Sequence, residues 1–201
     1  MKNMKMGIDI NLFNINHNLT NVEKGKCLIS EPFSPDSYFG RSVVLITEHN
    51  EKEGTLGYIL NKPVEVHIND IMADFPSFDA KCFVGGPVNP DTLHYLHNRF
   101  DLFPKSTHIK GDIYWGGDFE LLKEHIIEKK ITPKEIRFYL GYSGWAPEQL
   151  QSEIKEKFWI VSDIKPKTIM TANKNTWKEI LNKLGDSYSL WANAPANPSM
   201  N

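Results

Sequence analysis

Short apolar runs, separated by glycine, proline and polar turns, recur along this chain and constrain its fold more than any other feature. The strongest run is Val43 to Ile46, whose continuous apolar character is typical of a strand buried on both faces. The polar residues 49–54 separate it from a second strand pattern at 55–61, and the two together predict a β-hairpin. In order along the chain, strands are predicted over residues 26–30, 41–48, 55–61, 81–84, 93–97, 113–115, 137–140 and 159–162.

Helical patterns are fewer. Asp118 is placed to cap a helix over 118–129, whose apolar face carries Phe119, Leu122 and Ile126. Further helices are predicted over 148–157 and 175–184, with a short one over 68–73 and an irregular tail from residue 188. Because strands and helices alternate without a regular strand–helix–strand repeat, the pattern favours an α+β fold over a doubly wound parallel sheet.

The length of 201 residues suits one large domain. We expect residues 22–201 to form it, and the asparagine-rich residues 1–21 to be a loosely packed N-terminal arm. No apolar stretch reaches the length of a signal peptide or of a membrane span, which favours a cytoplasmic protein without membrane contact.

The charges and the metal-ligating residue types exclude several classes of function. A formal net charge of -2 argues against a dedicated nucleic-acid-binding protein, since such proteins usually carry a basic excess. Cys27 and Cys82 lie inside apolar stretches, where each is expected to pack as a small buried residue. His94 and His97 would point to opposite faces of a strand, with no third ligand near them in sequence. We therefore expect no metal and no cofactor.

The segment 141–145, Gly-Tyr-Ser-Gly-Trp, is the most suggestive of chemistry because it is expected to join a strand to a helix. A nucleophile elbow has this context, but its second glycine is replaced by Trp145, and no histidine follows Ser143. The same glycines could present backbone N–H groups to an anion at the helix start, with Arg41 supplying positive charge. The simpler interpretation, which we favour, is that they relieve steric strain in a tight turn.

Two other segments are open to the same pair of interpretations. Gly85-Gly86-Pro87 could approach a ligand closely, or could simply redirect a strand, and we favour the second. Glu48-His49-Asn50 offers an imidazole beside a carboxylate, but neighbours on a strand face opposite sides unless a turn begins there.

These segments, taken together and in this order, resemble the AlgH/YqgE family. The resemblance is carried by residues 25–32, 41–44, 48–50 with Gly57, 61–63, 83–88, the Leu96-His97 step, 140–145, Gln149-Leu150, Glu153 and Trp159, and it covers about residues 22 to 192. It implies a bacterial cytosolic protein with an α+β fold, in which a bifurcated mixed sheet includes a small closed barrel and is flanked by helices. It implies no established enzyme activity. One member is described as a candidate transcriptional regulator of alginate production, which is a genetic role and not a demonstrated DNA contact.

The leading hypothesis is a regulatory or interaction protein without a catalytic constellation, acting on protein partners that the sequence does not name. The residues expected to line its binding groove are Arg41, Glu48, His49, Asn50, Asn61, Gly85, Gly86, Pro87, Tyr142, Ser143, Gly144 and Trp145. One alternative is a binder of a small anion, or an enzyme acting on one with His49 as acid or base, at a pocket formed by Arg41 and the glycine turns. The other alternative, direct DNA binding, requires a contiguous basic face despite the negative net charge.

Overall fold

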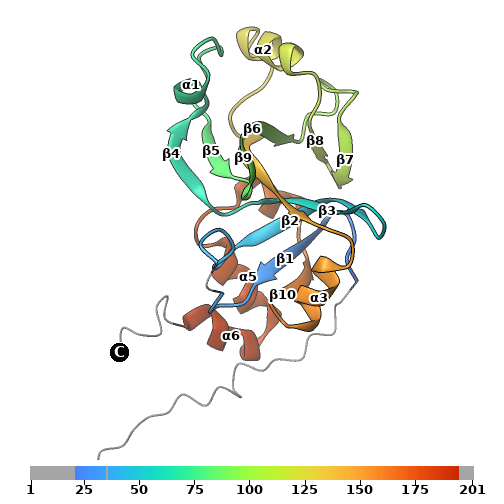
Figure 1. Cartoon of the computed structure of the whole chain (residues 1–201). Coiled ribbons are helices and arrows are strands. Elements are labelled where there is room, and N and C mark those ends of the chain that lie inside the picture. Colours follow the sequence, from blue (N-terminus) through green and yellow to red (C-terminus); the bar gives the residue numbers. More distant parts are fainter. Residues whose placement is uncertain (1–20, 35, 195–201) are drawn as a thin grey trace, which may run out of the picture.

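A computed structural model describes residues 21–34 and 36–194, which form ten strands and six helices (Figure 1). The N-terminal arm expected over residues 1–21 lies outside the described residues, apart from Asn21. The strands are β1 (Lys26–Ser30), β2 (Val43–Asn50), β3 (Gly54–Ile59), β4 (Pro63–His67), β5 (Lys81–Val84), β6 (Val88–His97), β7 (Thr107–Lys110), β8 (Ile113–Trp115), β9 (Ile136–Trp145) and β10 (Trp159–Asp163). The helices are α1 (Ile68–Ile71), α2 (Phe119–Ile127), α3 (Gln149–Lys155), α4 (Pro166–Thr171), α5 (Thr176–Leu184) and α6 (Asp186–Asn193).

One long strand, β9, organises the sheet. The strand order is β10-β1-β2-β3-β9-β6-β8-β7, with β5 and then β4 branching off at β9. The first half of β9 pairs in parallel with β5, through Phe138 to Leu140, whereas its last residues, Ser143 to Trp145, pair antiparallel with β3. The prediction of a mixed α and β fold with a bifurcated sheet is therefore confirmed.

The predicted small closed barrel is wrong. The sheet curls until Ile109 of β7 packs in the same core as Cys27 of β1, and Lys110 Nζ lies 3.1 Å from Asp163 Oδ1 at the end of β10. No ladder joins β7 to β1 or β10 among the described strands. The reason is local: β7 has four residues with a break in register, and the turn after it, at Gly111, meets Pro166 of α4. Side chains therefore bridge the seam, and the sheet stays open.

Glycines stand where main chains come closest, at the branch. A Cβ on Gly85 would lie 2.1 Å from the carbonyl oxygen of Gly141, and one on Gly86 would lie 2.3 Å from the carbonyl carbon of Tyr142. Gly141 itself has a φ of 64°, which a side chain rarely adopts. The glycines therefore permit β9 to leave β5 and continue beside β3, which supports their interpretation as architectural residues.

The turn predicted at 141–145 is also wrong. These residues continue β9, because after Gly141 bends the strand, β3 offers a new edge for hydrogen bonding. The next helix, α3, begins only at Gln149, after Glu148 in a left-handed conformation with a φ of 67°. The proposed anion-binding turn at a helix start is therefore absent from this segment.

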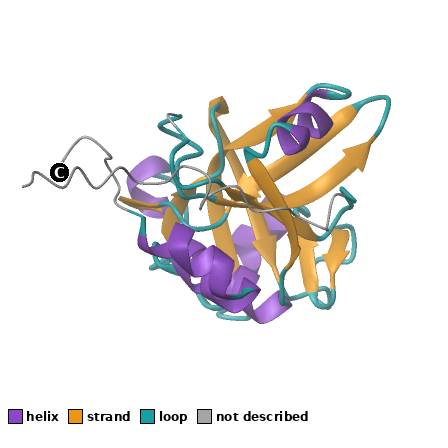
Figure 2. Cartoon of the chain, turned by 90° about the horizontal axis from the view of Figure 1, so that it is seen from below, coloured by secondary structure: helices purple, strands orange, loops and turns teal. Residues whose placement is uncertain are grey.

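The helices lie at both ends of the molecule. Figure 1 places α1 and α2 at one end, and α3, α5 and α6 at the other, and Figure 2 shows most helices gathered on one side of the strands. Trp177 and Leu181 of α5 and Trp191 of α6 close the core inside the curled sheet, whereas Leu122 of α2 packs on Phe138 in a second core. α3 packs in a third core with buried residues of β2, β3 and the end of β9.

Several elements were missed by the sequence patterns. β4, which begins at Pro63, was not predicted, nor were β7 and α4, and α6 occupies part of the tail expected to be irregular. The burial of Cys27 and Cys82 is confirmed. Within residues 21–34 and 36–194, none of the helices has the length and apolar content needed to span a membrane.

Candidate functional site

An open pocket of about 710 Å³ lies where the β2–β3 hairpin meets the end of β9 and the start of β7, and we call it the mouth pocket. Its lining combines an apolar floor with polar groups: Lys24, Thr47, Glu48, His49, Asn50, Glu53, Gly54, Thr55, Leu56, Val88, Thr107, Tyr142, Gly144 and Trp145. Half-buried Leu56 and Tyr142 pack against the core inside the curled sheet, so the pocket opens at one end of that core. Open ends of curled sheets are common places for binding sites.

The hairpin brings Glu48 and His49 to the same pocket although they are adjacent. The register between β2 and β3 shifts between Ile46 and Glu48, and such irregularities redirect side chains. Glu48 and Asn50 are exposed at the rim, whereas His49 is half-buried and its Nδ1 lies 2.8 Å from Thr55 Oγ1. The imidazole is thus oriented by a hydroxyl, and no carboxylate in the described part of the chain forms an ion pair with it.

The charges of the mouth pocket are more acidic than basic. Two carboxylates, Glu48 and Glu53, face one ammonium group, Lys24, and no arginine lines the pocket among the described residues. A phosphate or carboxylate ligand would therefore meet a repulsive rim, whereas a neutral or positively charged group would not.

Ser143 is not placed as a nucleophile. Its side chain is fully buried, and its hydroxyl donates to the carbonyl oxygen of Gly85 at 3.0 Å. This hydrogen bond ties β9 to the end of β5, so Ser143, Gly85 and Gly86 belong to the branch of the sheet. None of the three lines the mouth pocket.

Arg41 and Asn61 lie together, but away from the mouth pocket. The Asn61 side chain accepts from the N–H of Val43 at 2.8 Å and donates to the carbonyl of Arg41 at 2.9 Å. The Arg41 guanidinium donates to the carbonyl of Ala194 at 2.5 Å and lies 5.2 Å from the ring centroid of Trp177. Arg41 therefore fastens the C-terminal helices, and the structure does not bring it to the glycine segments.

A second hollow, of about 410 Å³, shares Gly144 and Trp145 with the mouth pocket, and we call it the tryptophan pocket. Pro87, predicted as a groove residue, lines it together with Ser30, Ser34, Asp36, Phe39, Gly144, Trp145, Gln149, Glu153, Phe158 and Trp159. The structure thus divides the predicted groove between two pockets. Glu48, His49, Asn50 and Tyr142 line the mouth pocket, Pro87 lines the tryptophan pocket, and Gly144 and Trp145 line both.

Glu153 of α3 is the carboxylate at the centre of this pocket's hydrogen bonds, and it was not among the groove residues predicted from the sequence. Its Oε2 accepts the indole N–H groups of Trp145 at 2.8 Å and Trp159 at 2.7 Å, and its Oε1 accepts from Gln149 at 2.9 Å. The available signal was the four-residue spacing of Gln149 and Glu153, which places both on one face of a helix.

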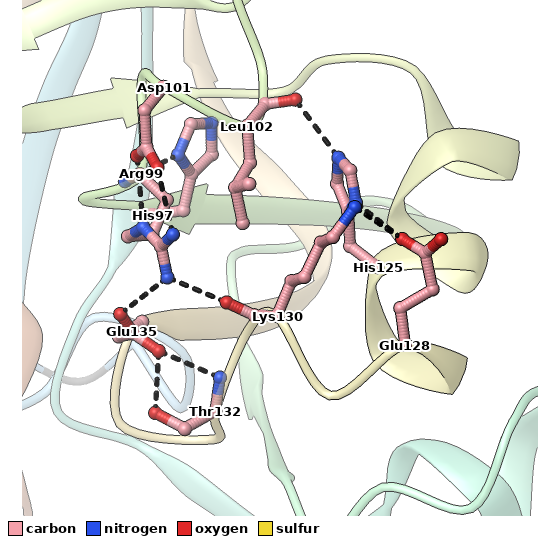
Figure 3. Close-up of polar contacts among 9 residues, drawn as sticks. All are labelled: His97, Arg99, Asp101, Leu102, His125, Glu128, Lys130, Thr132 and Glu135. Atoms are coloured by element: carbon pink, nitrogen blue, oxygen red, sulfur yellow. Dashed lines mark hydrogen bonds and ion pairs between the residues drawn. The ribbon is translucent and has the colours of Figure 1, made fainter.

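A polar cluster beneath α2 is held by hydrogen bonds to the main chain and by ion pairs between side chains (Figure 3). His97 is fully buried, its Nδ1 accepts from the N–H of Arg99 at 3.1 Å, and its Nε2 therefore donates to the carbonyl of Gly116 at 3.0 Å. Burial lowers the pKa of His97 to about 4. Arg99 in turn binds Asp101 and Glu135 at 2.8 and 2.9 Å. The cluster fastens the loop after β6, and its histidine is kept neutral.

The two histidines of β6 face opposite sides, as predicted. His94 lies 5.4 Å from the ring of Tyr58, inside the curled sheet, whereas His97 lies 4.7 Å from the ring of Phe103, in the core under α2. Throughout the described part of the chain, no three His, Cys, Asp or Glu side chains gather as a metal site would need.

Together these features define a mixed α and β protein whose curled, branched sheet carries an open pocket at one end. Comparison with known proteins gives the family. A family model described as AlgH-like matches residues 27–189, and the chain belongs to the AlgH-like family. The UPF0301 protein BF2109 of Bacteroides fragilis is 43% identical over 198 residues, covering 98% of this chain and 100% of that protein. A UPF0301 protein of Bacteroides thetaiotaomicron is 42% identical over the same length and coverage.

Two solved structures share the fold. Protein DIP2367 of Corynebacterium diphtheriae superposes with a TM-score of 0.71 at 22% identity, covering 91% of this chain and 97% of its own. The AlgH protein of Pseudomonas aeruginosa, solved in solution, gives 0.68 at 24% identity, covering 90% and 98%. These likenesses establish the arrangement of the elements.

Proposed function

We propose that this protein is a cytoplasmic regulatory or interaction protein that binds a protein partner through the mouth pocket and performs no chemistry there. One observation carries the proposal: residues from segments far apart in sequence, around Glu48 and around Tyr142, meet at one open pocket. The groups that a reaction would use are otherwise engaged, since Ser143 is buried and His49 is paired with Thr55.

The make-up of the pocket suits a protein partner. Leu56, Val88 and Tyr142 provide an apolar floor, and the exposed Glu48, Asn50 and Glu53 provide a polar rim. Protein interfaces commonly combine an apolar centre, often with tyrosine, with a solvated polar rim. A projecting side chain or short segment of a partner would fill the pocket, with its flanking residues on the rim.

The two alternatives receive less support. A small-anion site would need a cation at the glycine segments, but Arg41 is bound to Ala194, and among the described residues the pocket offers only Lys24 against two carboxylates. Direct DNA binding would place the same carboxylates near phosphates, which repel them.

Site-specific photocrosslinking in cells tests the proposal. A benzophenone amino acid replaces Thr107, which is exposed and lines the pocket, and the matched control carries it at Asp112, exposed in the β7–β8 turn. We expect a discrete protein adduct from position 107 and none from position 112. Adding Glu48→Lys should abolish that adduct, because it reverses a rim charge without touching the core.

Two results would contradict the proposal. One is the same set of adducts from both positions, which would indicate random collision. The other is a small molecule bound at one per chain in native mass spectrometry and released by His49→Ala.

A further inference from the structure

The tryptophan pocket holds a carboxylate that no cation of the described residues neutralises. Glu153 accepts hydrogen bonds from two indoles and one amide, all of which are uncharged donors. Within the described residues, no lysine, arginine or histidine forms an ion pair with Glu153. A half-buried carboxylate is costly unless it is paired, so an unpaired one at a pocket points to a positively charged ligand.

The hydrogen bonds fix this carboxylate in position. Trp145 and Trp159 are 5% and 3% exposed, and their rings meet edge to face at 5.8 Å, so both indole N–H groups converge on Oε2. Oε1 accepts only from Gln149 among the described residues, and a carboxylate oxygen has room for a second donor. The group is thus preorganised with acceptor capacity to spare.

The rest of the lining has the same sign of charge and an aromatic surface. Asp36 lines the pocket, and its Oδ1 accepts the N–H groups of Tyr38 and Phe39 at 2.7 and 2.9 Å. Lys62 lies near Asp36 and donates to the carbonyl of Ser37, but it does not line the pocket.

Aromatic side chains supply the accessible surface. Phe158 is 42% exposed, and Phe39, partly exposed, packs on both indoles at 5.3 and 5.9 Å. A planar cation that stacks on aromatic rings and donates to carboxylates in a fork is a guanidinium, which the compact, strongly hydrated ammonium of lysine matches less well.

We propose that the tryptophan pocket is a binding site for a guanidinium group, held by Glu153 and Asp36 against Phe39 and Phe158. The site shares Gly144 and Trp145 with the mouth pocket but does not depend on the partner-binding role proposed there. The guanidinium could come from an arginine of another protein or from a free small guanidinium compound.

Intrinsic tryptophan fluorescence of the full-length protein reads out binding, because Trp145 and Trp159 line the pocket. The probe is ethylguanidinium chloride, titrated well below denaturing concentrations with sodium chloride holding the ionic strength constant. Ethylurea, of the same shape without charge, is the ligand control. We expect a saturable change with ethylguanidinium and none with ethylurea.

Variants locate the site. Glu153→Gln should weaken binding by about tenfold, whereas the matched control Asp112→Asn, an exposed carboxylate in the β7–β8 turn, should leave it unchanged. If circular dichroism shows that Glu153→Gln is unfolded, Asp36→Asn and Phe158→Ala replace it, since both residues are exposed and each change should weaken binding severalfold.

Binding of a short peptide with one arginine, with its citrulline analogue as the uncharged control, distinguishes the two sources of the guanidinium. Tighter binding of the arginine peptide than of ethylguanidinium assigns the site to a protein side chain, and weaker binding assigns it to a free compound. A change with ethylurea equal to that with ethylguanidinium, a change that never saturates, or equal affinity in the pocket variants and Asp112→Asn would overturn the proposal.

Discussion

Acid should destabilise this protein through His97, by an amount that can be worked out from its surroundings. The ring is fully buried, and Nδ1 is occupied as an acceptor from the N–H of Arg99, so a second proton has no favourable place. Its pKa falls from 6.5 to about 4 because burial disfavours the charged form. The hydrogen bond to the carbonyl of Gly116 and the charge of Asp101 both raise this pKa, and burial outweighs them.

The sign and the size of this loss of stability follow from the linkage between protonation and folding. Since the folded pKa is depressed, the unfolded chain binds the proton more readily, and the contribution of His97 is complete above the unfolded pKa of 6.5. It is lost as the pH falls from 6.5 to about 4, and lower pH adds nothing further. The interval between these pKa values corresponds to a loss of at most about 3 kcal/mol.

Urea unfolding at a series of pH values measures this loss. His97→Gln removes this titrating group. Between about pH 7 and pH 4 we therefore expect the free energy of unfolding of the variant to fall by about 3 kcal/mol less than that of the unaltered protein. The matched control is His108→Gln. Because His108 is exposed, this substitution should leave the dependence of the free energy of unfolding on pH as it is in the original protein. Parallel pH profiles for His97→Gln and the unaltered protein would refute the reasoning.

Three further predictions concern the branch, the buried arginine and the thiols. Gly141→Ala should lower the free energy of unfolding by about 2 kcal/mol or more. The φ of Gly141 is 64°, and the added Cβ would lie 2.7 Å from the carbonyl oxygen of Val88. An unchanged melting temperature would contradict this. Arg137→Met should lower the free energy of unfolding by about 3 kcal/mol in chemical denaturation. Arg137 is buried and donates to the carbonyls of Leu60, Met170 and Ala172 at 2.8 to 3.0 Å, and these carbonyls would lose their donor. Arg99→Met, in the more exposed cluster, should lower it less. Cys27 and Cys82 should resist iodoacetamide at about pH 8 until urea unfolds the chain, because burial raises their thiol pKa values to about 12 and about 11; rapid labelling of the folded protein would show the thiols to be accessible.

The sequence identified most of the regular structure because the signals are local. Asp118 was predicted as a cap, and its carboxylate accepts from the N–H groups of Glu120 and Leu121 at 3.0 and 3.2 Å. The strand at Lys26–Ser30 and the helix ending at Leu184 follow the predicted ranges within a residue. Each of these depends on neighbours a few residues away, through hydrogen bonds or apolar periodicity that the order of residues displays.

The candidate sites were only partly predictable. The segment around Glu48 and His49 and the one around Tyr142 were recognised, but the sequence could not show that Arg41 would leave them for Ala194, more than 150 residues along the chain. Glu153 was missed as a site residue because its role depends on two tryptophans that approach it from β9 and β10.

By itself, then, the sequence determined most of the strands and helices, the burial of Cys27 and Cys82, and that glycines mark places of close approach. Tertiary structure alone decided that 141–145 continues β9 instead of turning, that the sheet curls without closing, and that two pockets share Gly144 and Trp145. The physical reason is that a strand continues wherever an unpaired edge is available to it. The edge that β3 offers to β9 comes from residues about 90 positions earlier, and no local pattern encodes it.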